Sequence, residues 1–222
     1  MINLPINKNT FLFDMDGTLV NTEPVGPKVL LDLFNAHEIT LTREEKELFV
    51  KVWRRDGTDI KEEDYLTELA SKYALNKHPL DFIQEFYENY KSEIIKAEEL
   101  PGVTSFLHRA TQGGKQLLLV TSSKRVQAEA ILSFHHWRAL FADIISEEDI
   151  TRFKPDPEPY LVAAKKVKSS IENCIVFEDA KNGVTAGKLA GAYVVGLRAG
   201  NQVKQDLSGA DQIVSSFEEL GL

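Results

Sequence analysis

Several features common in other protein classes are scarce in this sequence, and each scarcity excludes something. Cysteine occurs once among 222 residues, at Cys174, so no internal disulfide can form and a reducing compartment is expected. No apolar run approaches the roughly 20 residues of a membrane-spanning helix. Residues 1–8 contain no apolar stretch long enough for a signal peptide. We therefore expect a cytoplasmic protein without a membrane partner.

Positive charge is also in short supply. The 26 Lys and Arg residues are outnumbered by 34 Asp and Glu residues, which gives a formal net charge of -8. Such a surface repels a phosphate backbone, so nucleic acid is not an expected partner. A small anionic molecule is still admissible, because one local cation can override the overall field. A monomer is the default expectation for the oligomeric state.

The apolar residues occur in short runs that are bounded by turn residues and separated by helical patterns. The runs cover 11–13, 116–120, 143–145, 174–177, 193–197 and 212–214. Helical periodicity occurs between them, at 124–134, 159–167 and 182–190. This alternation is typical of parallel strands joined by crossover helices, so the predicted fold class is α/β with a parallel sheet.

Residues from about 20 to 97 break this alternation. No strand pattern occurs there, and apolar residues recur at helical spacing. The two clearest stripes are Ile83, Phe86, Tyr90 and Ile94, and Tyr65, Leu66, Leu69 and Tyr73. Most connections between a strand and a helix take about 2–6 residues, so this length favours a separate helical insertion over helices that cover one sheet face. The predicted division is 1–18 and 97–222 for the core and 19–96 for the insertion.

Polar residues follow the predicted strands at the point where each one ends. Ligands bind beyond the carboxyl ends of the strands in an open parallel sheet, so these residues are candidates for one shared site. In chain order they are Asp14, Asp16, Thr121, Ser122, Ser123, Lys154, Glu178 and Asp179. Taken singly, each could be a helix cap or a surface residue. Their joint occurrence at successive strand ends predicts a site.

Clustered carboxylates repel one another unless a cation lies among them. The four carboxylates here are those of Asp14, Asp16, Glu178 and Asp179. Oxygen ligands suit Mg²⁺, so this set predicts a magnesium site. With Mg²⁺ and Lys154 the net charge is -1, or zero if Asp16 is protonated, and a phosphate dianion can enter only such a compensated site. Hydroxyl and amide groups of Thr121 and Ser122 can hold phosphate oxygens without adding charge.

The spacing of Asp14 and Asp16 suits phosphoryl transfer. A carboxylate that faces a phosphoryl group can form an aspartyl-phosphate, which splits one difficult displacement into two easier ones. A second carboxyl group two residues along can protonate the leaving alkoxide and later deprotonate water. Gly17 permits the sharp chain reversal that brings Asp16 back over the site.

Four segments of the chain resemble, in order, the motifs of the haloacid dehalogenase superfamily, in the branch with a helical cap after the first strand. The segments are 14–18, 120–122, 154–155 and 178–183, and the likeness covers nearly the whole chain. It implies a Rossmann-like core with an inserted, mobile α-helical cap domain. Because the dehalogenases lack a second acid and the phosphonate-cleaving members carry alanine there, the presence of Asp16 implies phosphoryl transfer.

The resemblance also implies a role for each residue at the strand ends. Asp14 is expected to be the nucleophile and Asp16 the general acid and base. The expected magnesium ligands are Asp14, the Asp16 backbone carbonyl, Asp179 and, directly or through water, Glu178. The expected phosphate ligands are Thr121, the Ser122 amide and Lys154, which would also order the nucleophile.

The relatives implied by these motifs include sugar-phosphate phosphatases and hexose-phosphate mutases of the β-phosphoglucomutase kind. Such mutases usually carry a histidine near the position of Gly26 and a lysine where Asp56 precedes Gly57. Both departures favour a phosphoric monoester hydrolase that acts on a small phosphorylated metabolite, with a sugar phosphate as the expected substrate. A hexose-phosphate mutase is the alternative.

Further residues are candidates for contact with the substrate, namely Glu23, Arg54, Arg55, Ser123 and Lys124. Arg54 and Arg55 could bind a hydroxyl-rich or anionic leaving group, or could complement the end of a helix closed by Gly57. Glu23 could face the substrate or the solvent. Ser123 and Lys124 fit a solvated helix start equally well.

A phospho-receiver signalling domain is the alternative from another class, because it too gathers acids, a hydroxyl group and a lysine around magnesium. It is expected to lack the helical insertion and the acid two residues past its phosphorylated aspartate. A receiver would also hold its phosphoryl group, and a pure binding protein would release none.

Overall fold

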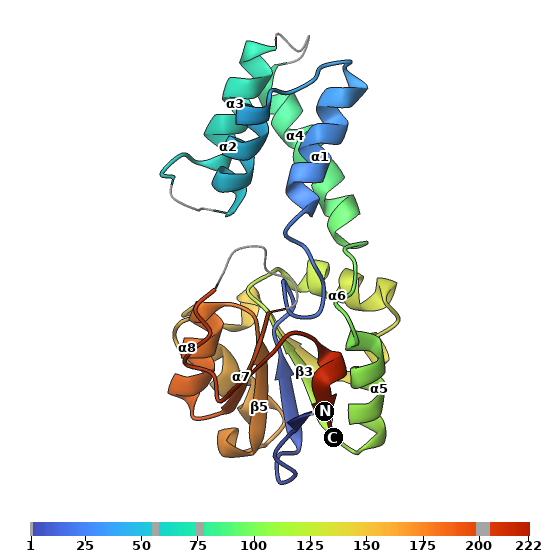
Figure 1. Cartoon of the computed structure of the whole chain (residues 1–222), viewed down its shortest axis with the longest axis vertical. Helices are drawn as coiled ribbons and strands as arrows, with labels where there is room; N and C mark the ends of the chain where they lie inside the picture. The colour runs from blue at the N-terminus through green and yellow to red at the C-terminus, as the bar shows by residue number, and fades with distance from the viewer. Residues whose placement is uncertain (1, 55–57, 74–77, 199–204) are drawn as a thin grey trace. The chain divides into compact units, whose positions relative to one another are not determined.

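The computed structural model describes residues 2–54, 58–73, 78–198 and 205–222. The chain forms two compact units (Figure 1). The sheet unit comprises Met1–Asn21 and Ala97–Leu222, and the helical unit comprises Thr22–Lys96. Within the described ranges, no helix has both the length and the apolar character that a membrane crossing requires.

Six parallel strands form the sheet, in the order β4-β3-β2-β5-β6-β7. They are β2 (Thr10–Phe13), β3 (Gln116–Val120), β4 (Phe141–Ile145), β5 (Cys174–Glu178), β6 (Tyr193–Leu197) and β7 (Gln212–Val214). Each contains one of the predicted runs, which confirms the α/β class with a parallel sheet. After β2 the chain builds one side of the sheet with β3 and β4 and then crosses to β5, so the order reverses at β2. Such a reversal point is where open α/β sheets bind ligands.

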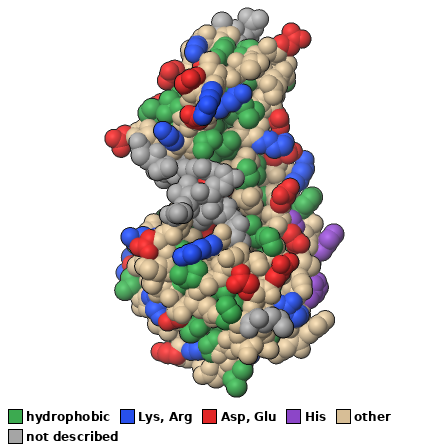
Figure 2. All heavy atoms as spheres, in the orientation of Figure 1, with side chains coloured by type: hydrophobic (Ala, Val, Ile, Leu, Met, Phe, Trp, Pro, Cys, Tyr) green, Lys and Arg blue, Asp and Glu red, His purple; other side chains and the backbone are tan. Residues whose placement is uncertain are grey.

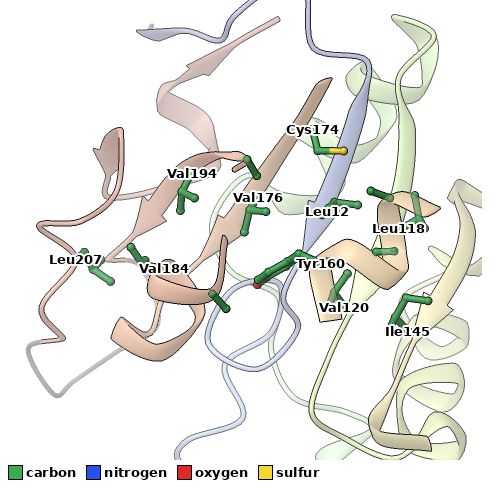
Figure 3. Packing of buried hydrophobic residues seen from close by; sticks show 14 residues of the cluster. Leu12, Leu118, Val120, Ile145, Tyr160, Cys174, Val176, Val184, Val194 and Leu207 are labelled. Carbon is green, nitrogen blue, oxygen red and sulfur yellow. The ribbon is translucent and has the colours of Figure 1, made fainter. Parts of the chain in front are cut away.

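The helices of the sheet unit are α5 (Val103–Gln112), α6 (Arg125–Phe134), α7 (Glu158–Lys166) and α8 (Lys181–Ala190). An apolar cluster joins α7 and α8 to one face of the sheet. In Figure 3, Tyr160 of α7 lies in the middle of this cluster, among Leu12, Val120 and Val176 of three neighbouring strands.

An aromatic cluster fills the opposite face. Phe13 of β2 stacks on Phe177 of β5 with ring centroids 4.6 Å apart, and Phe106 of α5 lies 5.1 Å from Phe217. Successive residues of a strand point to opposite faces, which is why Phe11 and Phe13 belong to this cluster and Leu12 to the other. Because both faces are covered, the strands are nearly continuous apolar runs.

The helical unit contains α1 (Val25–Ala36), α2 (Arg43–Arg54), α3 (Glu62–Lys72) and α4 (Pro79–Ile94). Its core holds Phe86 and Ile94 as predicted, but Phe82 is fully buried where the sequence analysis expected Ile83, which is half-buried. The reason is aromatic packing, because the Phe82 ring meets that of Phe34 edge to face at 5.2 Å. Burial of the larger side chain contributes about 1.5–3 kcal/mol and sets the rotation of the helix.

The boundary of the helical unit also differs from the prediction. Residues 19–21 were assigned to the insertion but cluster with the sheet unit. The Leu100 amide donates to the Leu19 carbonyl oxygen at 2.9 Å, and the Asn21 amide donates to the Glu98 carbonyl oxygen at 2.8 Å. The outgoing and returning segments are thus paired by backbone hydrogen bonds, which a sequence pattern does not reveal.

A short pairing of the chain ends was also not predicted. Strand β1 (Ile2–Asn3) lies parallel to β8 (Leu220–Gly221) in a separate two-stranded sheet. Two residues are too few to show an alternating pattern, so the sequence carries no signal for either strand.

Charged side chains of both signs are interspersed on the visible face of each unit (Figure 2). Many form exposed pairs, such as Lys28 with Asp32 at 2.8 Å and Arg43 with Glu47 at 2.7 Å. Exposed pairs of this kind contribute about 0–1 kcal/mol. The charges with an unusual environment therefore include four buried carboxylates, which are those of Asp14, Glu45, Glu178 and Asp179.

Candidate active site

Residues that follow neighbouring strands meet at the carboxyl edge of the sheet. Phe13 of β2 is paired with Phe177 of β5, so Asp14 comes to lie beside Glu178. The Asp14 amide extends the ladder by donating to the Phe177 carbonyl oxygen at 3.0 Å. Carboxylate oxygens of Asp14, Glu178 and Asp179 all lie within 4.8 Å of one another. The structure therefore brings together three of the four predicted carboxylates.

Lys154 joins two of these carboxylates. Its Nζ donates to Asp14 Oδ1 at 2.6 Å, to Glu178 Oε1 at 2.7 Å and to the Val120 carbonyl oxygen at 3.0 Å. The lysine side chain is 8% exposed, so its charge acts in a poorly hydrated environment. The structure thus places Lys154 in contact with Asp14, which the sequence predicts to be the nucleophile.

The segment before α7 fixes the position of Lys154. Glu158, at the start of the helix, accepts hydrogen bonds from the amides of Thr151 and Arg152 at 2.8 and 3.1 Å. Asp156 accepts a hydrogen bond from the Glu158 amide at 2.9 Å. These contacts close residues 151–158 into a loop, and Lys154 lies at its centre.

The loop after β2 folds back on itself. The Gly17 amide donates to the Val20 carbonyl oxygen at 2.8 Å, and Gly17 has a φ of 82°, which favours glycine. A Cβ on Gly17 would lie 2.2 Å from Asp179 Oδ2. Thr18, which is fully buried, donates from Oγ1 to Asp179 Oδ1 at 3.2 Å. Gly17 and Thr18 thereby let the loop approach Asp179 and orient its carboxylate.

Asp16 is half-buried and lies next to the loop after β3. The Ser123 hydroxyl donates to Asp16 Oδ2 at 2.9 Å. The Ser123 amide in turn donates to Thr121 Oγ1 at 3.0 Å, and Thr121 is buried. Ser123, which the sequence analysis considered as a substrate contact, therefore holds the predicted acid and base.

The electrostatics of the site are unfavourable for three ionised carboxylates. Burial raises the pKa of Asp14 well above its usual range, and the charges of Glu178, Asp179 and Asp16 raise it further against the opposing charge of Lys154. Burial and the charge of Glu178 raise the pKa of Asp179 to about 7.

Lys154 responds in the opposite sense. Burial lowers the pKa of Lys154, but the charges of Asp14 and Glu178 outweigh burial and raise it well above its usual value. Lys154 is thus fully charged, but its single positive charge does not offset the negative charge of all the carboxylates around it.

These observations test whether the residues suit a divalent cation. The donors of Asp14, Glu178 and Asp179 are all carboxylate oxygens, and Mg²⁺ and Ca²⁺ prefer oxygen ligands. Burial and the neighbouring carboxylates both raise the pKa values of Asp14 and Asp179, and a bound cation would favour their ionised forms. The site therefore fits a hard divalent cation.

Two residues around Glu178 escaped the sequence analysis as site residues. A Cβ on Gly183 would lie 1.8 Å from Glu178 Oε1, so only glycine leaves room for this side chain. Tyr160 donates from its hydroxyl group to the same oxygen at 2.6 Å. Gly183 belongs to a quoted motif, but an aromatic residue on a helix is typical of a core, so Tyr160 carried no distinguishing signal.

The remaining predicted residues lie in different parts of the chain. Ser122 is exposed, and Lys124 is exposed at the N-terminal end of α6. Glu23 is half-buried in the helical unit, and Arg54 ends α2. Arg55, like Asp56 and Gly57, lies outside the described residues. Contact of these residues with a substrate stays a prediction.

Comparison with known proteins identifies the family of the chain and supports its fold. The pattern of the family described as haloacid dehalogenase-like hydrolase matches residues 11–197. The chain belongs to this family of hydrolases.

Two relatives show how similar the sequence is to those of known proteins. The chain is 30% identical to the bifunctional riboflavin kinase/FMN phosphatase of Arabidopsis thaliana, and the match covers 95% of the chain. The chain spans about half of that relative, 54% of its length. It is 28% identical to the validoxylamine A 7'-phosphate phosphatase of Streptomyces hygroscopicus subsp. limoneus, with 94% of each chain covered.

A solved structure shares the fold. The crystal structure of a candidate β-phosphoglucomutase from Thermotoga maritima matches with a TM-score of 0.80, 24% identity and 95% of each chain covered. At this level of identity the match concerns the fold of the chain.

Proposed function

We propose that the chain is a magnesium-dependent phosphatase that hydrolyses a small phosphomonoester, with a sugar phosphate as the expected class, through an aspartyl-phosphate on Asp14. The observation that carries the proposal is the cluster of Asp14, Glu178 and Asp179 within 4.8 Å, with Lys154 Nζ on Asp14 at 2.6 Å. Two relatives named as phosphatases of phosphorylated small molecules support it.

The first half of the reaction joins Asp14 to phosphorus. A carboxylate oxygen of Asp14 attacks the phosphoryl group and forms an acyl-phosphate bond while the ester P–O bond breaks. Asp16 gives its proton to the leaving alkoxide oxygen. The hydrogen bond from Ser123 to Asp16 supports this role, because it orients the carboxyl group without contributing a charge.

The second half regenerates the enzyme. Asp16, now a carboxylate, takes a proton from a water molecule, and the oxygen of that water attacks phosphorus. The bond between phosphorus and Asp14 breaks, inorganic phosphate leaves, and Asp14 is again a free carboxylate. Lys154 keeps its positive charge next to Asp14 throughout both halves and offsets part of the negative charge there.

Magnesium would be held by Asp14, Asp179 and the Asp16 backbone carbonyl, with Glu178 as a direct or water-mediated ligand. When bound, it supplies positive charge that offsets the phosphoryl oxygens and the crowded carboxylates. Thr121, the Ser122 amide and Lys154 are the proposed phosphate ligands. The buried position of Thr121 at the end of β3 supports its part in this set.

The helical unit weighs against a mutase. A Cβ on Gly26 would lie 2.3 Å from the indole ring of Trp53, so a histidine at this position would require Trp53 to move. Trp53 is in turn packed against Phe49 and Tyr90, with ring centroids 5.9 and 5.0 Å away. The packing of the helical unit therefore disfavours the histidine that mutases of this kind usually carry.

A panel of phosphomonoesters with Mg²⁺ tests the proposal. We expect release of inorganic phosphate, loss of release on addition of EDTA, and recovery when Mg²⁺ is restored. The same mixtures should be assayed for conversion of glucose 1-phosphate to glucose 6-phosphate. Isomerisation that outpaces phosphate release would make the chain a mutase, and a stable phosphoprotein without turnover would make it a receiver.

A further inference from the structure

Tyr160 has the surroundings of a core residue and the contacts of a site residue. It lies near the start of α7, is fully buried, and packs its ring among Leu12, Val120 and Val176 (Figure 3). Its hydroxyl group leaves this apolar cluster and donates to Glu178 Oε1 at 2.6 Å. The ring is thus held by packing, while the hydroxyl group reaches the carboxylates.

Lys154 shares the same oxygen of Glu178. Its Nζ donates to Oε1 at 2.7 Å and lies 5.1 Å from the centre of the Tyr160 ring. A carboxylate oxygen has two lone pairs, so these two donors saturate Oε1. Oε2 accepts one long hydrogen bond, from the Ala180 amide at 3.3 Å. Oε2 is therefore the oxygen that can still take an external ligand.

The two donors on Oε1 differ in what else they do. Lys154 is also bound to Asp14 and the Val120 carbonyl oxygen, so its position depends on the charges in the site. Tyr160 is neutral, and its ring is immobilised by the apolar cluster. The tyrosine hydroxyl group can therefore fix the rotation of Glu178 without changing the net charge of the site.

We propose that Tyr160 is a positioning residue that holds Glu178 Oε1 so that Oε2 serves the divalent cation. This inference rests on the proposed function for the identity of the ion, but it can be tested by cation binding alone. Removal of a group that orients a metal ligand typically lowers metal affinity or activity by about 10-fold to 100-fold.

The variant Tyr160→Phe removes the hydroxyl group and keeps the ring. Titration calorimetry with MgCl₂ should give a dissociation constant about 10-fold to 100-fold above that of the unaltered chain. At saturating Mg²⁺, kcat for phosphomonoester hydrolysis should fall while KM stays within about threefold, because Tyr160 is fully buried and its hydroxyl group is bound to Glu178. Tyr193→Phe is the matched control, since its hydroxyl group meets Gln212 of β7, outside the carboxylate cluster. It should bind Mg²⁺ as the unaltered chain does.

A double-variant cycle separates positioning from a general structural role. If Tyr160 acts through Glu178, Tyr160→Phe should add nothing to the loss of Mg²⁺ affinity caused by Glu178→Gln. A Tyr160→Phe chain that melts at a lower temperature but binds Mg²⁺ normally would overturn the inference. An unaltered chain that binds Mg²⁺ more tightly than Tyr160→Phe but hydrolyses no phosphomonoester would overturn the proposed function and leave the inference standing. An unaltered chain that binds no Mg²⁺ would overturn both.

Discussion

Glu45 in the helical unit and Asp14 in the sheet unit are both buried carboxylates that contact a lysine, yet their pKa values move in opposite directions. Glu45 accepts hydrogen bonds from Lys72 at 2.6 Å, Tyr73 at 2.7 Å and the Thr42 amide at 2.7 Å. Burial would raise the pKa of Glu45, but these donors outweigh burial and lower it to about 2.

Asp14 has one lysine that it must share. Lys154 also binds Glu178 at 2.7 Å, and Asp179 lies in the same cluster of carboxylates. Burial and like charges therefore prevail, and the pKa values of Asp14 and Asp179 rise.

The difference distinguishes a structural carboxylate, that of Glu45, from the carboxylates that we propose as functional. The Glu45 carboxylate completes the N-terminal cap of α2, since the Glu45 amide also donates to Thr42 Oγ1 at 3.2 Å. All its interactions stabilise the ionised form. The carboxylates of the sheet unit have raised pKa values because they are buried together with one lysine. Such perturbed pKa values are typical of a functional site.

The largest effect is expected for Asp14→Asn. Loss of the nucleophile should lower kcat by at least about 10³-fold. The melting temperature without added metal should not fall, because the raised pKa of Asp14 means that the fold favours an uncharged group there. Phosphate release and thermal unfolding measure the two quantities. Asp143→Asn on β4 is the control, and a marked loss of stability specific to Asp14→Asn would break the comparison with Glu45.

Asp16→Asn should lower kcat by about 10²-fold to 10⁴-fold through loss of proton transfer. The loss should be smaller for p-nitrophenyl phosphate than for an alkyl phosphate, because the nitrophenolate leaves without a proton. Mg²⁺ affinity should change little, since the expected ligand at this position is the backbone carbonyl. Equal losses with both substrates would contradict the role of Asp16 as the acid.

Gly183→Ala should displace Glu178, because the new Cβ would lie 1.8 Å from Oε1. We expect Mg²⁺ affinity and kcat/KM to fall by about 10-fold to 100-fold. Gly209→Ala introduces the same methyl group 3.5 Å from Val184 Cγ1, which is ordinary contact, and should leave both quantities unchanged. Equal Mg²⁺ affinity and equal kcat/KM in the two variants would argue against a fixed position of the Glu178 side chain.

The smallest effect is expected for Glu45→Gln, and it should concern stability alone. The lowered pKa of Glu45 contributes stability that is present above about pH 4.5 and is lost as the pH falls toward 2. Glu45→Gln should therefore reduce the free energy of unfolding by about 1–2 kcal/mol at pH 7, a value discounted because Lys72 is half exposed. The deficit should shrink at pH 3. Urea unfolding measures it, with exposed Glu44→Gln as the control and kcat unchanged in both.

The sequence predicts those parts of the chain that depend on local order. Apolar runs locate the strands, and polar residues after them locate the site, because the carboxyl ends of parallel strands share one edge. The contacts of Asp14 with Lys154 and Glu178 follow from this rule.

Other contacts depend on how distant segments pack. The hydrogen bond from Tyr160 to Glu178 depends on where α7 lies along the strands of the sheet. The spacing of apolar residues does not predict this position. The choice of Phe82 over Ile83 depends on Phe34, nearly 50 residues away in the chain. Ser123 is directed to Asp16 by the fold of two loops that follow different strands.

Calorimetric titration of Mg²⁺ into the unaltered chain and into Asp179→Asn tests most directly whether the sheet unit holds a cation site. We expect one ion per unaltered chain and affinity at least about 10-fold weaker in Asp179→Asn. Asp206→Asn, which alters an exposed carboxylate, is the control. Equal affinity in all three chains, or no binding by the unaltered chain, would contradict this expectation.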